Sequence, residues 1–184
     1  MTVSLRARGA PEAAALFLRP WRDEDAEPLI EAYRDPVLRQ WTRVPVENTE
    51  DAERWLGTQR RGWETGERLS FAVFEERTDG ATGPLVANVV LKRAGLRERA
   101  AEVGYWTAAP ARGRGVAPRA LEALTDWAFE SFADEGMTRL DLLHQVDNPA
   151  SCRVAEKAGY RYHQTLPAHP PFPRDGHLHI RESR

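Results

Sequence analysis

The stretch that most constrains the fold is Ala111–Leu121, which reads ARGRGVAPRAL. It lies between a strand-like run and a segment with helical periodicity. Two glycines weaken an ordinary helix start, but they let the backbone approach a ligand without side chains in the way. The first turn of a helix has free N–H groups and the positive end of the helix dipole, which together bind phosphate. Gly113 and Gly115 therefore predict a phosphate cradle, to which Arg112 and Arg114 add positive charge.

The same stretch is also compatible with a tight surface turn whose arginines are only solvated. Known phosphate loops match it poorly, because the G-K-[ST] of a Walker A loop is missing. Pro118 occupies the place of the third glycine in a dinucleotide fingerprint. The run of antiparallel strand signals before the turn is also unlike a βαβ unit.

Strand and helix signals together predict a mixed α/β fold. Strand patterns cover residues 16–21, 69–75, 85–91, 101–107, 139–146, 160–165 and the surroundings of 177–180. Helical patterns cover residues 23–33, 48–66, 116–132 and 148–158. The turns between the three central strands contain Gly80 and Gly95. This order predicts a mostly antiparallel sheet of six to seven strands flanked by about four helices.

Composition indicates one globular domain. The chain has 184 residues, 41% hydrophobic and 29% charged, and we expect a flexible leader over 1–14 before a domain over 15–184. A net charge of −2 gives no reason to expect nucleic acid or membrane as a partner. The single cysteine excludes an internal disulfide. Because no apolar membrane span or signal-peptide core is recognisable, we expect a cytoplasmic protein.

Two motifs carry a resemblance to a known family. The segment Glu102–Trp106 followed by Arg112–Ala117 resembles the acetyl-CoA signature of the GNAT N-acetyltransferase superfamily, [Q/R]-x-x-G-x-[G/A]. Asn148–Ser151 together with Lys157–Tyr160 resembles its second signature, an Asn-led helix that ends in K-x-G-[F/Y]. The motifs lie at the right separation, and the order of elements is similar as well.

The front half of the chain resembles one branch of that superfamily, the ribosomal-protein-alanine N-acetyltransferases. The similar segments are Leu16–Pro20 and Asn48–Ala52, and the whole resemblance covers about residues 15–165. It implies a GNAT fold whose sheet is splayed at the central strands, and acetyl-CoA as the co-substrate. The residues that it implies for cofactor binding are Trp106, Thr107, Arg112, Gly113, Arg114, Gly115, Val116, Ala117, Asn148 and Ser151.

Direct transfer of an acetyl group to an amine needs a base for the ammonium and a proton for the departing thiolate. Glu102 is the candidate base, acting through water, and the alternative is a rim carboxylate paired with a nearby arginine such as Arg99. Many members of the superfamily carry a tyrosine acid where this chain has Ala155. The resemblance to the alanine-acetylating branch instead favours Ser151 as the hydrogen-bond donor to the sulfur. Asn148 fits both an N-cap and a contact to the pantetheine amide.

The cysteine and the C-terminal histidines carry no expected chemistry. Cys152 lacks a recognisable His and acid arrangement and is interpreted as a small buried or half-buried side chain. His177 and His179 share one strand face, but no Cys or acidic residue at metal spacing joins them. A solvated tail is therefore expected, and no metal site.

The acceptor site is expected at the loop 40–46 and the segment 167–173, with Trp41 and Arg43 as candidate substrate contacts. Trp41 fits the core equally well. A short, polar final strand leaves room for a second subunit to complete the site, which makes a homodimer one expectation.

Three functions remain open at this point. The favoured one is an acetyl-CoA-dependent N-acetyltransferase acting on a primary amine, either a protein N-terminus or a small molecule. The alternative is a catalytically inactive GNAT-fold module that binds CoA or acyl-CoA, which Ala155 favours slightly. A dinucleotide-binding oxidoreductase is disfavoured by the missing third glycine.

Overall fold

A computed structural model describes residues 3–9, 13–93, 99–170 and 173–183, so the turn expected at Gly95 lies outside the described residues. The strands are β1 (Leu5–Ala7), β2 (Leu16–Pro20), β3 (Arg68–Glu76), β4 (Thr82–Lys92), β5 (Ala100–Thr107), β6 (Arg139–Gln145), β7 (Arg161–Leu166) and β8 (Gly176–Glu182). The helices are α1 (Ala26–Tyr33), α2 (Pro36–Trp41), α3 (Thr49–Thr65), α4 (Val116–Ser131) and α5 (Pro149–Lys157).

All eight strands form one sheet in the order β1-β2-β3-β4-β5-β6-β8-β7. Every neighbouring pair is antiparallel except β5 and β6. The predicted α/β fold with a mixed, mostly antiparallel sheet is therefore confirmed, with eight strands and five α-helices in the described parts of the chain.

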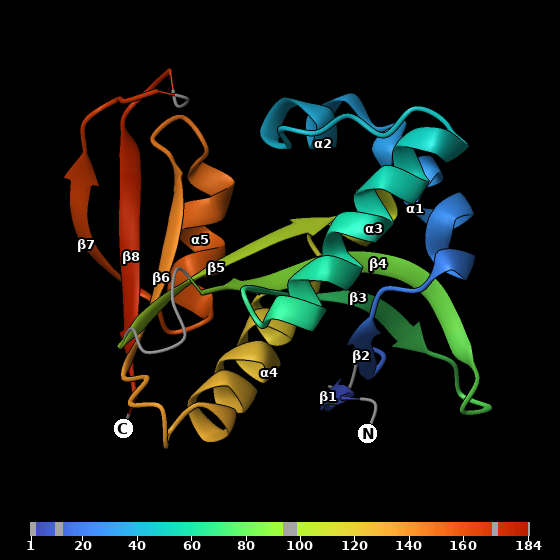
Figure 1. The fold of residues 1–184 in the computed structure, drawn as a ribbon, viewed down its shortest axis with the longest axis horizontal. Helices are drawn as coiled ribbons and strands as arrows, with labels where there is room; N and C mark the ends of the chain where they lie inside the picture. The colour runs from blue at the N-terminus through green and yellow to red at the C-terminus, as the bar shows by residue number, and fades with distance from the viewer. Residues whose placement is uncertain (1–2, 10–12, 94–98, 171–172, 184) are drawn as a thin grey trace.

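The sheet splits at its only parallel pair among the described strands. β5 pairs with β6 only over Ala100–Val103, whereas its pairing with β4 continues to Thr107. Beyond Val103 the two strands diverge, and the sheet opens into a V with β6, β8 and β7 on one arm (Figure 1). The predicted splay at the central strands is confirmed, and it leaves one side of the β5 backbone without a strand partner.

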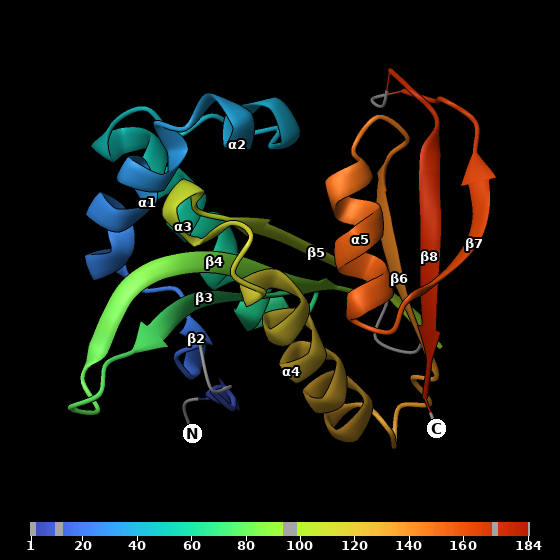
Figure 2. The same ribbon diagram turned by 180° about the vertical axis from the view of Figure 1, so that it is seen from behind.

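The helices cover the two faces of the sheet. α4 and α5 lie on one face and α1 to α3 on the other, as Figures 1 and 2 show from opposite sides. Alternation along β3 divides its side chains between two cores, since Phe71 and Val73 belong to the core that includes α4 residues. Ala72 and Phe74 belong to the core beneath α1 to α3.

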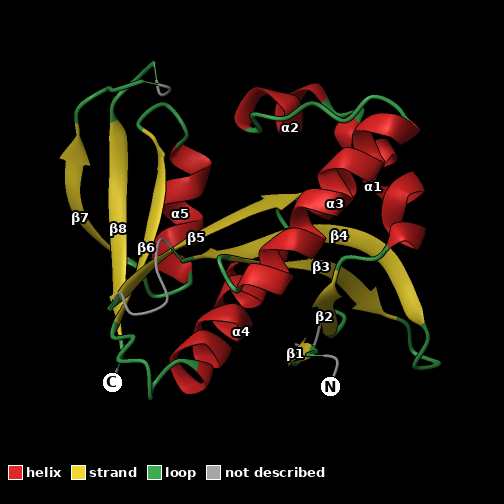
Figure 3. Ribbon diagram, in the orientation of Figure 1, coloured by secondary structure: helices red, strands yellow, loops and turns green. Residues whose placement is uncertain are grey.

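The helix α4 forms where the apolar spacing predicts it (Figure 3). Ala120, Leu121, Leu124 and Ala128 lie on one stripe and are fully buried. The helix begins directly after Gly115, which adopts a left-handed conformation with φ of 72°. This places the glycine turn at the end of β5 and at the mouth of the split in the sheet.

Part of the expected leader is ordered. Residues Leu5–Ala7 form the edge strand β1, which pairs antiparallel with Leu16–Leu18. Arg119 of α4 donates hydrogen bonds to the carbonyls of Arg8 at 2.8 Å and Ala14 at 2.7 Å. This pairing was not predicted, because short strands without strong alternation give little sequence signal.

The helix α2 was not predicted, and part of the expected loop 40–46 belongs to it. Pro36 stands at its first position, where its missing N–H costs nothing. Asp35 caps the helix, accepting hydrogen bonds from the amides of Val37 at 3.2 Å and Leu38 at 3.1 Å. Asp35 and Pro36 thus mark the boundary between α1 and α2.

The final strand differs most from the expectation. β8 has seven residues and lies between β6 and β7, so both of its edges are paired within the chain. It is neither a short strand awaiting a second subunit nor a solvated tail.

None of the helices in the described ranges is both long and apolar enough to cross a bilayer.

Candidate functional site

Two clefts meet at the split in the sheet. The smaller, of about 330 Å³, lies over the glycine turn and the N-terminus of α4. The larger, of about 710 Å³, lies between the α2–α3 side and the β6 arm. Both are lined by Trp41, Tyr105, Trp106, Asn148 and Ser151. These shared residues mark the place where ligands in the two clefts would meet.

The glycine turn is shaped for backbone contact. Gly113 has φ of 74° and Gly115 has φ of 72°, and no atom lies within 4 Å of where a Cβ would stand on either. No side chain caps the first turn of α4, so its N–H groups face the smaller cleft uncapped. The expected cofactor residues that line this cleft are Trp106, Thr107, Arg112, Gly113, Gly115, Val116, Ala117, Asn148 and Ser151.

Arg114 is the expected cofactor residue that the smaller cleft lacks. Its guanidinium instead forms an ion pair of 2.7 Å with Glu75. Arg112 pairs with Asp35, the N-cap of α2. Burial alone would raise the pKa of Asp35, but the Arg112 guanidinium and the α2 amides outweigh it and hold the pKa below its usual value.

Two further basic residues in the smaller cleft were not predicted from the sequence. Arg153 and Lys157 line it from α5. They stand four residues apart and therefore share one face of the helix. That spacing was the available signal, but only the fold shows that this face turns toward the glycine turn.

Ser151 and Tyr105 form a hydroxyl pair at the junction of the clefts. The Ser151 Oγ lies 2.9 Å from the Tyr105 hydroxyl, and Ser151 is buried. Asn148 is the N-cap of α5, and its side-chain oxygen accepts a hydrogen bond of 3.2 Å from the Ser151 amide. Burial raises the pKa of Tyr105, which the Ser151 hydrogen bond partly opposes, so the phenol keeps its proton at neutral pH.

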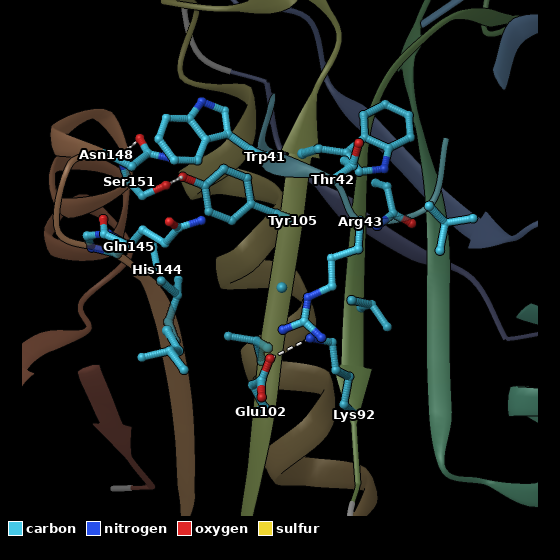
Figure 4. A pocket seen from close by; sticks show the side chains of 18 of the residues that line it. Trp41, Thr42, Arg43, Lys92, Glu102, Tyr105, His144, Gln145, Asn148 and Ser151 are labelled. Carbon is cyan, nitrogen blue, oxygen red and sulfur yellow. Dashed lines mark hydrogen bonds and ion pairs between the residues drawn. The ribbon is translucent and has the colours of Figure 1, made fainter. Parts of the chain in front are cut away.

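Tyr105 was missed because the tyrosine was sought in the helix, where Ala155 is fully buried. β5 supplies a tyrosine hydroxyl from across the split instead. Figure 4 shows the Tyr105 ring reaching toward Ser151, with the Trp41 indole beside Asn148.

Glu102 lies in the larger cleft, at the other end of the labelled residues from Ser151 (Figure 4). Its carboxylate pairs with Lys92 of the neighbouring strand, and the two side chains are 44% and 41% exposed. The alternative for Glu102 was an ion pair with an arginine such as Arg99; its partner is instead Lys92, which directly opposes Glu102 in the β4–β5 register.

The two expected substrate contacts both line the larger cleft. Trp41, at the end of α2, is half-buried and also lines the smaller cleft. Arg43 is exposed, and its side chain extends along the cleft toward Glu102 and Lys92 (Figure 4).

Cys152 is half-buried, as expected, but its surroundings were not foreseen. Its sulfur lies 3.4 Å from His144 Nε2 and 3.4 Å from His177 Nδ1. His179 is only 1% exposed, which overturns the expectation of a solvated tail. Burial raises the pKa of the Cys152 thiol and lowers the pKa of His144. These residues lie on β6, α5 and β8, and His144 also lines the larger cleft.

Similar solved structures share this architecture. A protein from Vibrio cholerae described as a ribosomal-protein-serine acetyltransferase is 26% identical, with a TM-score of 0.79 over 91% of this chain and 94% of that one. Mycobacterium smegmatis RimJ in complex with CoA-disulfide is 20% identical, with a TM-score of 0.78 over 99% and 87%. The microcin self-immunity acetyltransferase MccE, in complex with acetyl-CoA and AMP, is 17% identical, with a TM-score of 0.76 over 91% and 92%.

Sequence comparison assigns the chain to a family but not to any individual protein of known function. No curated protein matches this chain. The model of the acetyltransferase (GNAT) domain matches residues 15–161, a range that includes the glycine turn, the strands β5 and β6 on either side of the split, and α5. The chain therefore belongs to the GNAT acetyltransferase domain family.

Proposed function

We propose that this chain is an acetyl-CoA-dependent N-acetyltransferase that transfers the acetyl group directly to a primary amine. The observation that carries the proposal is the junction of the two clefts at the Tyr105–Ser151 pair. One cleft offers backbone amides for a phosphate group, and the other offers a carboxylate for a cationic amine. Direct transfer requires such a meeting point between donor and acceptor.

In the smaller cleft the chain would bind the cofactor mainly through its backbone. The uncapped first turn of α4 and the two glycines would hold the pyrophosphate, with positive charge from Arg112, Arg153 and Lys157. The unpaired side of β5 beyond Val103 would accept the pantetheine arm. Bound acetyl-CoA supplies the activated acyl group.

At the junction of the clefts, the chain would supply a proton to the departing thiolate. The Ser151 hydroxyl would donate a hydrogen bond to the departing sulfur, and Tyr105 would donate its own proton toward Ser151 Oγ. The raised pKa of Tyr105 suits a proton donor, because the phenol is protonated at neutral pH.

In the larger cleft Glu102 would attract the protonated amine and take its proton through water. Its ion pair with Lys92 holds the carboxylate in place on the cleft wall. Trp41 and Arg43 would flank the incoming acceptor.

The acceptor is proposed as either a protein N-terminus or a small-molecule amine. The similar structures include acetyltransferases described as acting on ribosomal proteins, and MccE, which was solved with AMP. The larger cleft, of about 710 Å³, is wide enough for a peptide terminus or a drug-sized amine.

The test is thiol release from acetyl-CoA over a panel of N-terminal peptides and small amines, with CoA binding measured on the same sample. We expect release above the amine-free rate with at least one acceptor class. CoA binding without turnover on any amine would instead support the inactive CoA-binding module and overturn the enzymatic proposal.

A further inference from the structure

Four side chains of types that can ligate a metal converge at the edge of the larger cleft. They are His144 of β6, Cys152 of α5, and His177 and His179 of β8, and one ligand atom from each lies within 4.8 Å of all the others. His144 directly opposes His177 in the β6–β8 register. Alternation places His179 on the same face as His177, and α5 brings Cys152 onto that face.

Three of the six separations between the ligand atoms match those around a tetrahedral zinc ion, and the remaining three lie within 4.8 Å. The sulfur of Cys152 lies 3.4 Å from His144 Nε2 and 3.4 Å from His177 Nδ1, and His144 Nε2 lies 3.3 Å from His179 Nε2. With Zn–N of about 2.05 Å and Zn–S of about 2.3 Å, tetrahedral geometry places nitrogens about 3.3–3.4 Å apart and sulfur about 3.5–3.6 Å from nitrogen. These three separations therefore agree with tetrahedral zinc to within about 0.2 Å, and the other three ligand pairs would come closer together when the ion binds.

A second group orients one of the ligands. His144 Nδ1 lies 2.8 Å from the backbone carbonyl of Gln145. A carbonyl only accepts, so the ring proton resides on Nδ1 and the lone pair of Nε2 points into the cluster. Metal-binding histidines commonly have this arrangement, in which the remote nitrogen donates to a carbonyl or carboxylate.

The cluster is partly buried and partly accessible to solvent. His179 is buried, whereas the other three side chains are partly exposed, which gives an ion a path from solvent. The ring of Tyr162 packs edge-on against His177 and His179, with centroids 5.4 Å and 5.8 Å away. The Tyr162 ring therefore covers part of the cluster and leaves the rest open to solvent.

We propose that His144, Cys152, His177 and His179 form a structural zinc site. One thiolate and three imidazoles are the nitrogen and sulfur donors that zinc prefers. Four protein ligands leave no open coordination position, which is the arrangement of a structural site. The ion would fasten α5 to β6 and β8 and so fix the helix that carries Ser151, the direct neighbour of Cys152. The site departs from the expectation that the chain holds no metal.

The experiment uses the full chain without a histidine tag. Zinc is removed with a chelator and returned, and zinc per chain is measured by elemental analysis with cobalt as a spectroscopic substitute. We expect one ion per chain, tetrahedral cobalt bands in the visible, and a sulfur-to-cobalt charge-transfer band in the near-ultraviolet. Zinc should also raise the melting temperature of the apo protein.

Two variants separate the site from adventitious binding. Cys152→Ser should remove the charge-transfer band and weaken zinc binding by more than about 100-fold. His163→Ala, which deletes an exposed histidine of β7 outside the cluster, should change neither. An octahedral cobalt spectrum, a missing charge-transfer band in the wild type, or equal losses in both variants would overturn the proposal. If Cys152→Ser fails to fold, the cobalt spectrum of the wild-type protein alone tests the proposal.

Discussion

The first prediction concerns Ser151, one member of the hydroxyl pair at the junction of the clefts. Ser151→Ala removes the donor proposed to face the leaving sulfur, so kcat should fall by about 10²-fold while the KM for acetyl-CoA changes little. The measurement is thiol release at saturating amine. Ser131→Ala, at the exposed end of α4, is the matched control and should retain full activity.

Tyr105 tests whether the two hydroxyls act as one unit. Tyr105→Phe and Ser151→Ala are expected to be non-additive, the double variant losing little more than Ser151→Ala alone. Fully additive losses would show that the hydroxyls act independently, and the proposed relay would then be wrong.

Glu102 and Lys92 can be tested against each other because they form one ion pair. Glu102→Gln should lower kcat/KM for the amine by about 10²-fold and leave CoA affinity unchanged, since the base is lost but the smaller cleft is intact. Lys92→Met removes the pair but keeps the carboxylate, so its loss should be much smaller. Equal losses in the two variants would indicate that Glu102 serves only as the structural partner of Lys92.

At the scale of elements, a substitution in the glycine turn can distinguish the cost of backbone strain from the loss of ligand binding. Gly115→Ala forces alanine into φ of 72°, which should cost about 1–2 kcal/mol in the free energy of unfolding and also weaken CoA binding. Gly80→Ala, in the β3–β4 connection with φ of 79° and open space around it, imposes the same strain far from the clefts. Calorimetry and CoA titration should therefore show similar stability losses but a binding defect only in Gly115→Ala.

Periodic elements were predictable, and their arrangement was not. The stripe in α4 and the Asn-capped α3 lie where spacing and capping residues placed them, within a residue or two. Helix α2 was missed because six residues carry too little periodicity to distinguish a helix from a loop. The insertion of β8 between β6 and β7 was also missed, because strand order depends on tertiary packing rather than on local pattern.

The candidate site divides in the same way. The positions of Gly115 before α4 and of Asn148 as the N-cap of α5 could be predicted from the sequence, because they depend on local backbone geometry. The histidine–cysteine cluster could not, since its ligands come from three elements that only the order β6-β8-β7 brings together. Tyr105 belongs to this second class, because its contact with Ser151 spans the split in the sheet.

A buried hydroxyl pair ties α4 to the start of β7 and gives a pH-dependent prediction. Thr125 and Tyr160 are both fully buried and hydrogen-bonded to each other. Burial raises the pKa of Tyr160 from 10.0 to about 12. Since the unfolded tyrosine ionises first, this residue stabilises the fold fully below pH 10.0, and its contribution is lost as pH rises toward about 12.

Tyr160→Phe should therefore flatten the loss of stability at alkaline pH. It should also cost about 1–3 kcal/mol at neutral pH, because the Thr125 hydroxyl loses its buried partner. Denaturant unfolding at several pH values measures both effects. Tyr162→Phe, at an exposed position on β7, is the control and should leave the neutral-pH stability nearly unchanged. An unchanged alkaline slope in Tyr160→Phe would contradict the prediction.

At the scale of the whole molecule, the sheet consists of two arms joined by a short parallel seam. The seam covers only Ala100–Val103 and Arg139–Leu142, and the smaller cleft opens directly beyond it. Residues from both arms line that cleft, including Thr107 and Gly115 on one side and Asn148 and Lys157 on the other. A ligand seated there contacts both arms at once and adds to the connection that the seam makes.

CoA binding should therefore protect both sides of the split together. At a CoA concentration about 100 times Kd, linkage adds about 2.7 kcal/mol to the free energy of unfolding. For a chain of this size that should raise the melting temperature by about 5–10 °C. Hydrogen exchange should slow at the end of β5, in the first turn of α4 and in the first turn of α5, and remain unchanged in the β1–β2 pair at the far edge of the sheet. Protection confined to the α4 turn would mean that the ligand binds one arm only, and the split would then have no part in holding the cofactor.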